Sequence, residues 1–497
     1  MSSDNISTDG HIEIMDHKPV LRKNNQEFDK RWILITFITI AILIIGIVFN
    51  SKSSDNDATK VAGLMNIDNG DSKINWNRYS AKNIELNENL TITDSGIYHL
   101  SGILDDGTIT IDSGIKGEVK LILDNVSISS QIGPAINCSS GDDLVIELIG
   151  NNTLQDSVSY DGIDQDMAGA IYSKADLTFE GEGTLNLIAN YQDAIIGKDD
   201  VKFNGGTYYI TAPDDGIHGK DSVSIMDGIF NINARQDAIK STNDTDTEKG
   251  FVLIQGGDIR ISSGDDGIYA ERTLVIQSGT TSISRSHEGL EAQKIIINGG
   301  HLSITSSDDG INASSKQRTA SKSVSTTSDA DDNCTIIIND GDIYINASGD
   351  GVDSNGQIYF NGGSTIIDGP INNNNSALDS GSGIIVGGGT VLAVSSSSMI
   401  EKFNEASTIL SVDIYFEDAK SIGAKIEIKD LAGKTLINHT SAKPFNHVMA
   451  SSADFVLGET YYIYINGEKY QDFTINSSIT TVNKPKSNIT IPDNHKR

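Results

Sequence analysis

A short phrase that ends in an acid, a glycine and an aliphatic residue recurs along this chain and constrains its fold more than any other feature. Its clear copies are Asp214–Ile217, Asp265–Ile268, His287–Leu290, Asp308–Ile311 and Gly349–Val352, with looser copies at Gln192–Ile195 and Gln236–Ile239. Successive aliphatic residues are 22, 22, 29, 22, 21 and 41 positions apart. A unit of about 22 residues, stretched twice by insertions, is typical of a solenoid whose repeats pack on their neighbours.

Each phrase is followed by two short runs in which apolar and polar residues alternate. After the first clear copy these runs are Ser222–Ile225 and Ile229–Ala234, separated by Asp227-Gly228. Alternation with a period of two indicates strands, and glycine suits the sharp corners between them. Three short strands per repeat favour a right-handed parallel β-helix of about ten coils.

The period also predicts which side chains stack inside this fold. One internal ladder should contain Ile195, Ile217, Ile239, Ile268, Leu290, Ile311 and Val352. A second should contain Phe203, Ile225, Leu253 or Ile254, Ile276 and Ile297. Insertions at 243–249 and 316–332 account for the two long steps, and the second insertion is expected to be a mobile surface loop.

Charge and cysteine content limit the possible partners. The formal net charge of −31 argues against nucleic acid and anionic membrane surfaces. Cys138 and Cys334 lie many coils apart, so two free thiols are expected rather than a disulfide. The protein is expected to be a monomer.

An apolar segment near the N-terminus predicts a membrane anchor. Residues 32–49 are uncharged and rich in isoleucine. A segment of this length can span a bilayer. Basic residues precede the segment, so the N-terminus is expected in the cytoplasm and the rest of the chain outside the cell. A cleaved signal peptide and a buried core helix are the alternatives.

The phrase stops at about residue 399, where alternating strands and an Asn466-Gly467 hairpin signal predict a small antiparallel module. The predicted fold class is therefore all-β, with the parallel β-helix, this C-terminal module and an N-terminal transmembrane helix. The predicted boundaries are a cytoplasmic tail at 1–31, the anchor at 32–49, a linker at 50–75, the β-helix at 76–398, the module at 399–480 and a disordered tail at 481–497.

Several motifs together resemble one known family. They are Gly96–Gly102, Ala170–Leu177, Asp214–Asp221, His287–Ala292, Ser306–Ala313, Ala442–Phe445 and Gly458–Tyr461. The chain is similar over roughly residues 80 to 475 to the calcium-binding, β-helical carbohydrate-binding domain of clostridial and other bacterial cell-surface proteins, which is related to family-nine pectate lyases. The resemblance implies calcium sites, binding to acidic plant polysaccharide or cellulose, and no established catalysis.

The acids of the phrase are the candidate metal ligands. Stacked on successive coils, they would lie within about 5 Å of each other, where like charges repel by on the order of 1 kcal/mol per pair even in water. Ca²⁺ relieves such repulsion because it takes six to eight oxygen ligands. The candidate ligands are Asp193, Asp214, Asp215, Asp237, Asp265, Asp266, Glu288, Asp308, Asp309 and Asp350. The alternative is that the acids are solvated turn residues.

A second candidate site lies on the outward positions of the strands. Tyr209, Arg260 and Tyr344 are predicted to contact sugar rings or uronate carboxylates, with ordinary strand surface as the alternative. The relation to family-nine pectate lyases implies that a lyase centre would pair calcium with a lysine base, and Lys198, Lys220 and Lys240 follow acid phrases.

These observations predict a cell-surface protein that binds calcium and a polysaccharide of the polygalacturonate or cellulose class without catalysis. A calcium-dependent lyase of pectate-lyase type and a structural wall adhesin or spacer remain alternatives.

Overall fold

The computed structural model of the protein describes residues 74–112, 117–315, 331, 333–372, 374–396 and 399–483. The predicted cytoplasmic tail, the predicted anchor at 32–49, nearly all of the linker, the insertion at 316–330 and the tail from 484 lie outside the described residues. The described residues form β-strands and two short 3-10 helices, η1 (Trp76–Arg78) and η2 (Gln165–Met167).

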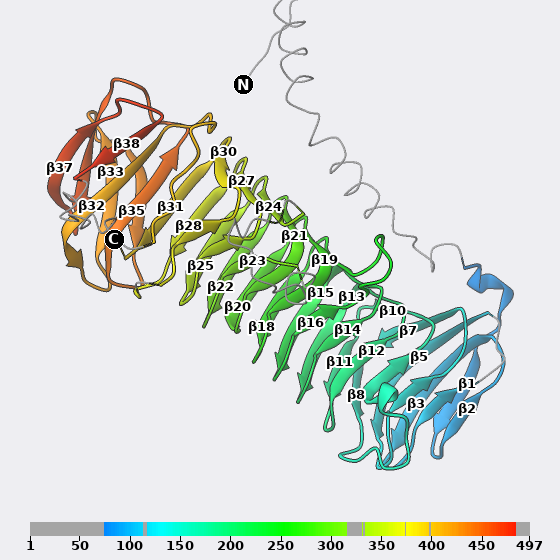
Figure 1. Cartoon of the computed structure of the whole chain (residues 1–497). Helices are drawn as coiled ribbons and strands as arrows, with labels where there is room; N and C mark the ends of the chain where they lie inside the picture. Colours follow the sequence, from blue (N-terminus) through cyan, green and yellow to red (C-terminus); the bar gives the residue numbers. More distant parts are fainter. Residues whose placement is uncertain are drawn as a thin grey trace, which may run out of the picture. The chain divides into compact units, whose positions relative to one another are not determined.

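Most strands belong to three parallel stacks, to which each repeat contributes one strand apiece (Figure 1). The first stack follows the acid-glycine phrase. It contains β2 (Leu90–Ile92), β4 (Ile109–Ile111), β6 (Ile136–Cys138), β9 (Gly169–Ser173), β12 (Asp193–Gly197), β14 (Ile217–Gly219), β16 (Ile239–Ser241), the first residues of β19 (Ile268–Ile276) and β21 (Leu290–Ile297), β23 (Ile311–Ala313), β26 (Val352–Ser354) and β29 (Leu378–Ser380).

The second stack comes next in each repeat. It contains β1 (Lys82–Leu86), the first parts of β3 (Gly96–Leu104) and β5 (Glu118–Ser129), β7 (Asp143–Ile149), β10 (Asp176–Gly181), the first parts of β13 (Asp200–Ala212) and β15 (Ser222–Ala234), β17 (Phe251–Ile254), the ends of β19 and β21, β24 (Thr335–Ile338), β27 (Gln357–Phe360) and β30 (Gly383–Val386).

The third stack closes each repeat. It contains the ends of β3, β5, β13 and β15 together with β8 (Asn151–Gln155), β11 (Thr184–Ile188), β18 (Asp258–Ser262), β20 (Thr280–Arg285), β22 (His301–Ser306), β25 (Asp342–Ala347), β28 (Ser364–Asp368) and β31 (Thr390–Ser395).

Both predicted internal ladders are confirmed by the strand register. Ile195 pairs with Ile217, Ile217 with Ile239 and Ile239 with Ile268, and the ladder continues through Leu290 and Ile311 to Val352. All seven side chains are fully buried. In the second ladder, Ile254 rather than Leu253 lies between Ile225 and Ile276. A shift of one residue in strand register would turn the ladder side chains from the core to the solvent-facing side of the sheet. Burial of one face therefore fixes the register.

The predicted fold class is wrong as a description of the whole architecture. The strands do not separate into a β-helix and an independent module, because 34 of them form one continuous sheet. Within it, β5, β7, β10, β13, β11 and β8 pair in a closed ring, a six-stranded parallel barrel. The ring closes because β5 and β13 are long and each pairs with two strands, β5 with β7 and β8, and β13 with β10 and β11. The repeat length does not specify such long strands.

The C-terminal region also differs from the predicted antiparallel module. Three of its strands, β32 (Ser411–Lys420), β35 (Phe445–Ser452) and β38 (Ile479–Val482), extend the large sheet, with β35 antiparallel to β31. The remaining four form a separate antiparallel sheet: β33 (Lys425–Asp430), β34 (Thr435–Thr440), β36 (Thr460–Ile465) and β37 (Glu468–Thr474). Pairing with β35 covers the backbone groups that β31 would otherwise expose at the edge.

The predicted localisation as a single-pass membrane protein is likewise corrected. Across the part of the chain that the structure describes, none of the helices has the length and apolar character needed to cross a bilayer. The segment at 32–49 on which the prediction rested lies outside the described residues. No membrane span is assigned. The prediction that Cys138 and Cys334 form no disulfide is confirmed, and both side chains are buried.

Candidate functional site

The acids of the repeated phrase form a column with two hydrogen-bonded segments, one from Asp193 to Asp266 and one from Asp309 to Asp350. The backbone N–H of Asp215 donates to Asp193 Oδ1 at 3.1 Å, that of Asp237 to Asp215 Oδ1 at 3.0 Å, and that of Asp266 to Asp237 Oδ1 at 2.9 Å. Further along, the Asp350 N–H donates to Asp309 Oδ1 at 2.6 Å. In Asp193, Asp215, Asp237 and Asp309, stacking therefore uses Oδ1 as a structural acceptor and leaves Oδ2 for a cation.

Two basic side chains, Lys240 and His218, contact the N-terminal part of this acid column. Lys240 Nζ lies 3.2 Å from Asp215 Oδ2 and 2.7 Å from Asp237 Oδ2, and so bridges two successive coils. His218 Nδ1 lies 3.5 Å from Asp193 Oδ2. Burial raises the pKa of Asp215 to about 7, with a further contribution from Asp193, while Lys240 opposes the shift. The Lys240 ammonium thus occupies the position between two carboxylates that a metal ion would otherwise take.

The C-terminal part of the column lacks such a lysine. Among residues 74–315 and 331–483, so far as the structure describes them, no lysine or arginine forms an ion pair with Asp266, Glu288, Asp309 or Asp350. Burial is the main cause that raises the pKa of Asp266 to about 10, of Glu288 to about 8, of Asp309 to about 7 and of Asp350 to about 6. Neighbouring carboxylates add to each shift.

A second acidic row runs beside the column, and the sequence prediction missed it. The residue that follows each ladder aliphatic pairs with its counterpart on the next coil, which gives the row Lys240, Tyr269, Glu291, Asn312, Asp353 and Asp379. Burial is the main cause that raises the pKa of Asp353 to about 8, and the nearby charges of Asp309, Asp350 and Asp379 add to the shift. The repeat phrase contained the signal, because this position directly follows the aliphatic residue in every copy.

The donor atoms of the C-terminal part suit a hard divalent cation. Carboxylate oxygens of Asp266, Glu288 and Glu291 lie within 4.8 Å of one another. Asn312 is buried, its Nδ2 donates to Glu288 Oε2 at 2.9 Å, and its Oδ1 has no hydrogen-bond partner among the described residues. An oxygen-only set with an unsatisfied amide oxygen fits Ca²⁺ better than softer metals.

The acids that precede the column residues are less enclosed. Asp265 is exposed and Asp214 is half-buried, and burial raises the pKa of both carboxyls. Asp308 Oδ2 lies 3.7 Å from His287 Nε2. Asp265, Asp266 and His287 can approach one ion, as can His287, Glu288 and Asp308. These positions are therefore placed beside the column rather than in its hydrogen-bonded line.

The predicted outward positions do share one register column. Tyr209 pairs with Asn231, Asn231 with Arg260, and the column continues through two serines to Tyr344. Their surroundings differ, however. Arg260 contacts the Asp258 carboxylate, and the Tyr344 hydroxyl donates to Asp368 Oδ2 at 2.8 Å. Tyr209 stays exposed, so the structure does not bring the three predicted sugar contacts together at one point.

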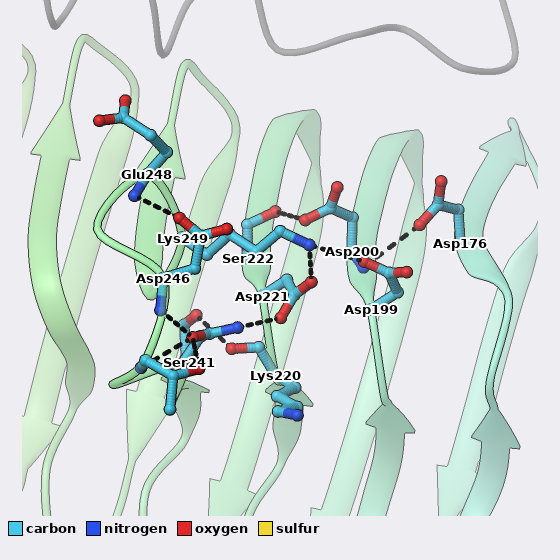
Figure 2. A network of polar contacts seen from close by, with 12 residues as sticks. Asp176, Asp199, Asp200, Lys220, Asp221, Ser222, Ser241, Asp246, Glu248 and Lys249 are labelled. Atoms are coloured by element: carbon cyan, nitrogen blue, oxygen red, sulfur yellow. Dashed lines mark hydrogen bonds and ion pairs between the residues drawn. The ribbon is translucent and has the colours of Figure 1, made fainter.

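Another acidic cluster lies where the first stack turns into the second. Figure 2 shows Asp176, Asp199, Asp200 and Asp221 on neighbouring coils, with Lys249 reaching toward them from the inserted loop. Lys249 Nζ contacts Asp221 and lies 3.6 Å from Asp199 Oδ1. Burial raises the pKa of Asp176 to about 7, and Asp199 and Asp200 add to the shift. Here, as at Lys240, the chain supplies its own cation.

Part of the chain is similar to known carbohydrate-binding domain proteins. Residues 86–332 match the family model described as "Carbohydrate-binding domain-containing protein". A protein of that description from Acetivibrio thermocellus is 32% identical over 145 residues, which are 28% of this chain and 50% of the relative. The match thus spans about half the length of that curated relative.

A solved structure described as the polysaccharide lyase-like protein from C. thermocellum, gadolinium derivative, is 30% identical with a TM-score of 0.39. The alignment covers 45% of this chain and 92% of that chain.

Proposed function

We propose that this protein binds polysaccharide and that Ca²⁺ held by the C-terminal part of the acid column takes part in binding acidic chains. The observation that carries the proposal is the set of close carboxylates of Asp266, Glu288 and Glu291. Burial raises the pKa of Asp266 and of Glu288, and neither has a lysine or arginine partner in the described structure. The carbohydrate-binding family match over residues 86–332 supports the ligand class.

The residues that would hold the ion are Asp266, Glu288, Glu291 and the amide oxygen of Asn312. A bound Ca²⁺ would offset their mutual repulsion and offer coordination positions to a uronate carboxylate. Two of these carboxylates are oriented by neighbouring side chains, since Asn312 Nδ2 donates to Glu288 Oε2 at 2.9 Å and Ser314 Oγ donates to Glu291 Oε1 at 2.7 Å. The net charge of −31 makes such mediation necessary, because an acidic polysaccharide would otherwise be repelled.

The proposal is binding without catalysis. A lysine that removes a proton needs a lowered pKa. Burial lowers the pKa of Lys240, but Asp215 and Asp237 outweigh burial and raise it above the ordinary value for lysine. Lys240 is therefore suited to neutralising carboxylates and not to acting as a base.

The test is a pull-down of the full chain on insoluble polygalacturonate and cellulose, in calcium and in chelator. We expect polygalacturonate to retain the protein in calcium and to release it in EDTA while circular dichroism stays unchanged. Formation of unsaturated uronides, followed by ultraviolet absorbance, would instead identify a lyase. Failure to bind either polysaccharide in both buffers would leave a structural spacer as the better description.

A further inference from the structure

Two fully buried carboxylates hold the C-terminal region, residues 399–483, together and against the coil stack. Asp368 lies on β28 in the third stack, and Asp413 lies on β32 in the C-terminal region. Neither belongs to the acid column. A buried carboxylate costs free energy unless hydrogen bonds and opposite charges compensate for the lost water. The partners of these two acids therefore decide how firmly the region is attached.

Asp368 receives hydrogen bonds from both sides of the junction between the third stack and the small antiparallel sheet. From the third stack, the Tyr344 hydroxyl donates to Oδ2 at 2.8 Å. From the C-terminal side, His439 Nε2 lies 2.8 Å from Oδ1, the Ser441 hydroxyl donates to Oδ1 at 3.0 Å, and the Ala442 N–H donates to Oδ2 at 2.9 Å. Each oxygen thus has two partners, and three of the four partners come from the C-terminal region.

A lysine in the connection between β34 and β35 also faces Asp368. Lys443 Nζ contacts the carbonyl oxygen of Ala347 and lies 3.1 Å from that of Asp368. Burial lowers the pKa of Lys443 to about 8, although the charge of Asp368 opposes the shift. The amine is therefore protonated throughout the acid range, and its contacts join the connection to both β25 and β28.

Asp413 has a comparable set of partners inside the C-terminal region. His447 Nε2 on β35 lies 2.5 Å from Oδ1, and Lys402 Nζ lies 2.6 Å from Oδ2. The Thr481 hydroxyl on β38 donates to Oδ2 at 3.5 Å. Burial, with the nearby Asp413 charge, raises the pKa of Tyr415 to about 12, so this neighbour stays neutral in acid. One carboxylate thus joins β32, β35 and β38 to the segment that follows β31.

These partners hold both carboxylates in their ionised form. Burial opposes ionisation of Asp368, but hydrogen bonds from His439 and Ala442 outweigh burial and hold its pKa below the ordinary value. Hydrogen bonds from His447 and Lys402 do the same for Asp413. The folded state therefore binds fewer protons here than the unfolded state. The resulting stability is present above the ordinary aspartate pKa of about 4 and is lost as pH falls through the lower folded value.

Acid acts in the opposite direction on a buried carboxylate of the coils. Burial raises the pKa of Asp176 to about 7, and Asp199 and Asp200 add to the shift. Protonation of Asp176 relieves a cost in the folded coil and removes no cationic partner. The internal ladders consist of apolar side chains that do not titrate. The coils and the C-terminal region should thus respond to acid with opposite sign.

We propose that the C-terminal region is an acid-sensitive cap on the coil stack, closed while Asp368 and Asp413 are ionised and opened before the coils unfold when both are protonated. Acid also favours imidazolium at His439 and His447, which would then be charged in a buried place without a counter-charge. Opening would uncover the edge of β31 that β35 covers in the closed state, and a free edge can pair with another chain. This inference is independent of the proposed polysaccharide binding.

Hydrogen exchange of the full chain, followed by mass spectrometry on EDTA-treated protein from pH 6.5 to pH 3, tests the proposal. Rates are corrected for the intrinsic effect of pH on exchange. We expect peptides of β32 and β35 to lose protection by roughly tenfold or more at the acid end, while peptides of β14 and β16 keep theirs. Loss of protection in the coils first or to the same extent, or unchanged protection in both regions, overturns the proposal.

Asp368→Asn keeps the size of the side chain and removes its charge. Peptides of β34 and β35 in this variant should already exchange roughly tenfold faster than wild type at pH 6.5. Asp418→Asn is the matched control, because Asp418 is an exposed acid on β32 and its loss should leave exchange unchanged. Equal exchange in the two variants overturns the role of Asp368. If Asp368→Asn does not fold, the wild-type pH series alone decides whether the cap opens before the coils.

Discussion

Three aspartates in the N-terminal part of the acid column each have two oxygens with different partners. In Asp193, Asp215 and Asp237, Oδ1 accepts the backbone N–H of the next acid, while Oδ2 faces Lys240 or His218. The hydrogen bond to Oδ1 needs only an acceptor oxygen and no charge, so an asparagine side chain could also accept it. The contact at Oδ2 requires negative charge, so the carboxylates of the column are explained by their cations and not by stacking alone.

Lys240→Met removes the cation between Asp215 and Asp237 and should destabilise the protein. Leaving two buried carboxylates without their partner is costly, and we expect a loss of roughly 2 kcal/mol in unfolding free energy in EDTA, below the values for fully buried pairs because Lys240 is partly exposed. Calcium should restore part of the loss. Urea denaturation in both buffers measures this, with exposed Lys220→Met as control. Equal stability of Lys240→Met and wild type in EDTA would contradict the role given to Lys240.

Asp156 offers a separate pH test outside the column. The side chain is buried, accepts from the Tyr160 hydroxyl at 2.9 Å, and has a pKa that burial raises to about 6. The folded state therefore binds more protons than the unfolded state between about pH 4 and pH 6, so this residue makes stability fall as pH rises through that window.

Asp156→Asn should remove that contribution. The unfolding free energy of the variant relative to wild type should increase from pH 4 to pH 7 and then level off, by an amount on the order of 1–3 kcal/mol. Chemical denaturation at a series of pH values provides the measurement. A constant difference between the two proteins across this range would show that Asp156 does not titrate with a raised pKa.

The strands draw their stability from the internal ladders. Ile217 is fully buried and pairs with Ile195 and Ile239, whereas Ser282 lies at an outward position between Arg260 and Ser303. Neighbouring rungs repeat the same contacts along the stack, so an error at one rung disturbs two interfaces. Outward positions contact solvent and tolerate substitution.

Ile217→Asp should prevent folding, while Ser282→Asp should change the unfolding free energy by less than about 0.5 kcal/mol. An unpaired charge at the ladder position has no partner and no route to water, which is why the two aspartates differ. Soluble yield and circular dichroism compare the variants directly. Comparable stability of the two would mean that the strand phase is displaced by one residue.

At the scale of the whole molecule, the net charge of −31 is concentrated by the repeat into rows of acids on successive coils. The chain neutralises some rows internally, with Lys240 in the column and Lys249 at the cluster of Figure 2. The C-terminal part of the column has no equivalent lysine among the described residues. A metal ion should therefore bind in that C-terminal part of the column. Its binding should stabilise the whole stack.

Calcium should raise the melting temperature of the full chain, and chelator should lower it. A ligand that binds only the folded state adds about 2.7 kcal/mol at a hundredfold excess over its dissociation constant. Differential scanning calorimetry in calcium, in magnesium and in sodium chloride of equal ionic strength separates a site from screening. We expect the largest rise in calcium, because Ca²⁺ accepts irregular oxygen sets that Mg²⁺ does not. An equal rise in all three salts would indicate screening alone.

The repeated phrase by itself determined the coils, the strand phase and both ladders. These are local properties, because a period of two within each strand and about 22 between coils decides which side chains face inward. It also determined that the acids would stack, which the hydrogen-bonded column bears out. Ile254 could not be chosen over Leu253, since both are apolar and only the register with Ile225 distinguishes them.

Tertiary structure alone decided the closed ring of six strands, the pairing of β35 with β31, and the partners of the functional side chains. Lys240 reaches two acids on different coils, Arg260 is taken by Asp258, and Tyr344 is held by Asp368. Such features depend on residues that stacking brings together from distant repeats, and on how far each side chain reaches, which no single repeat encodes.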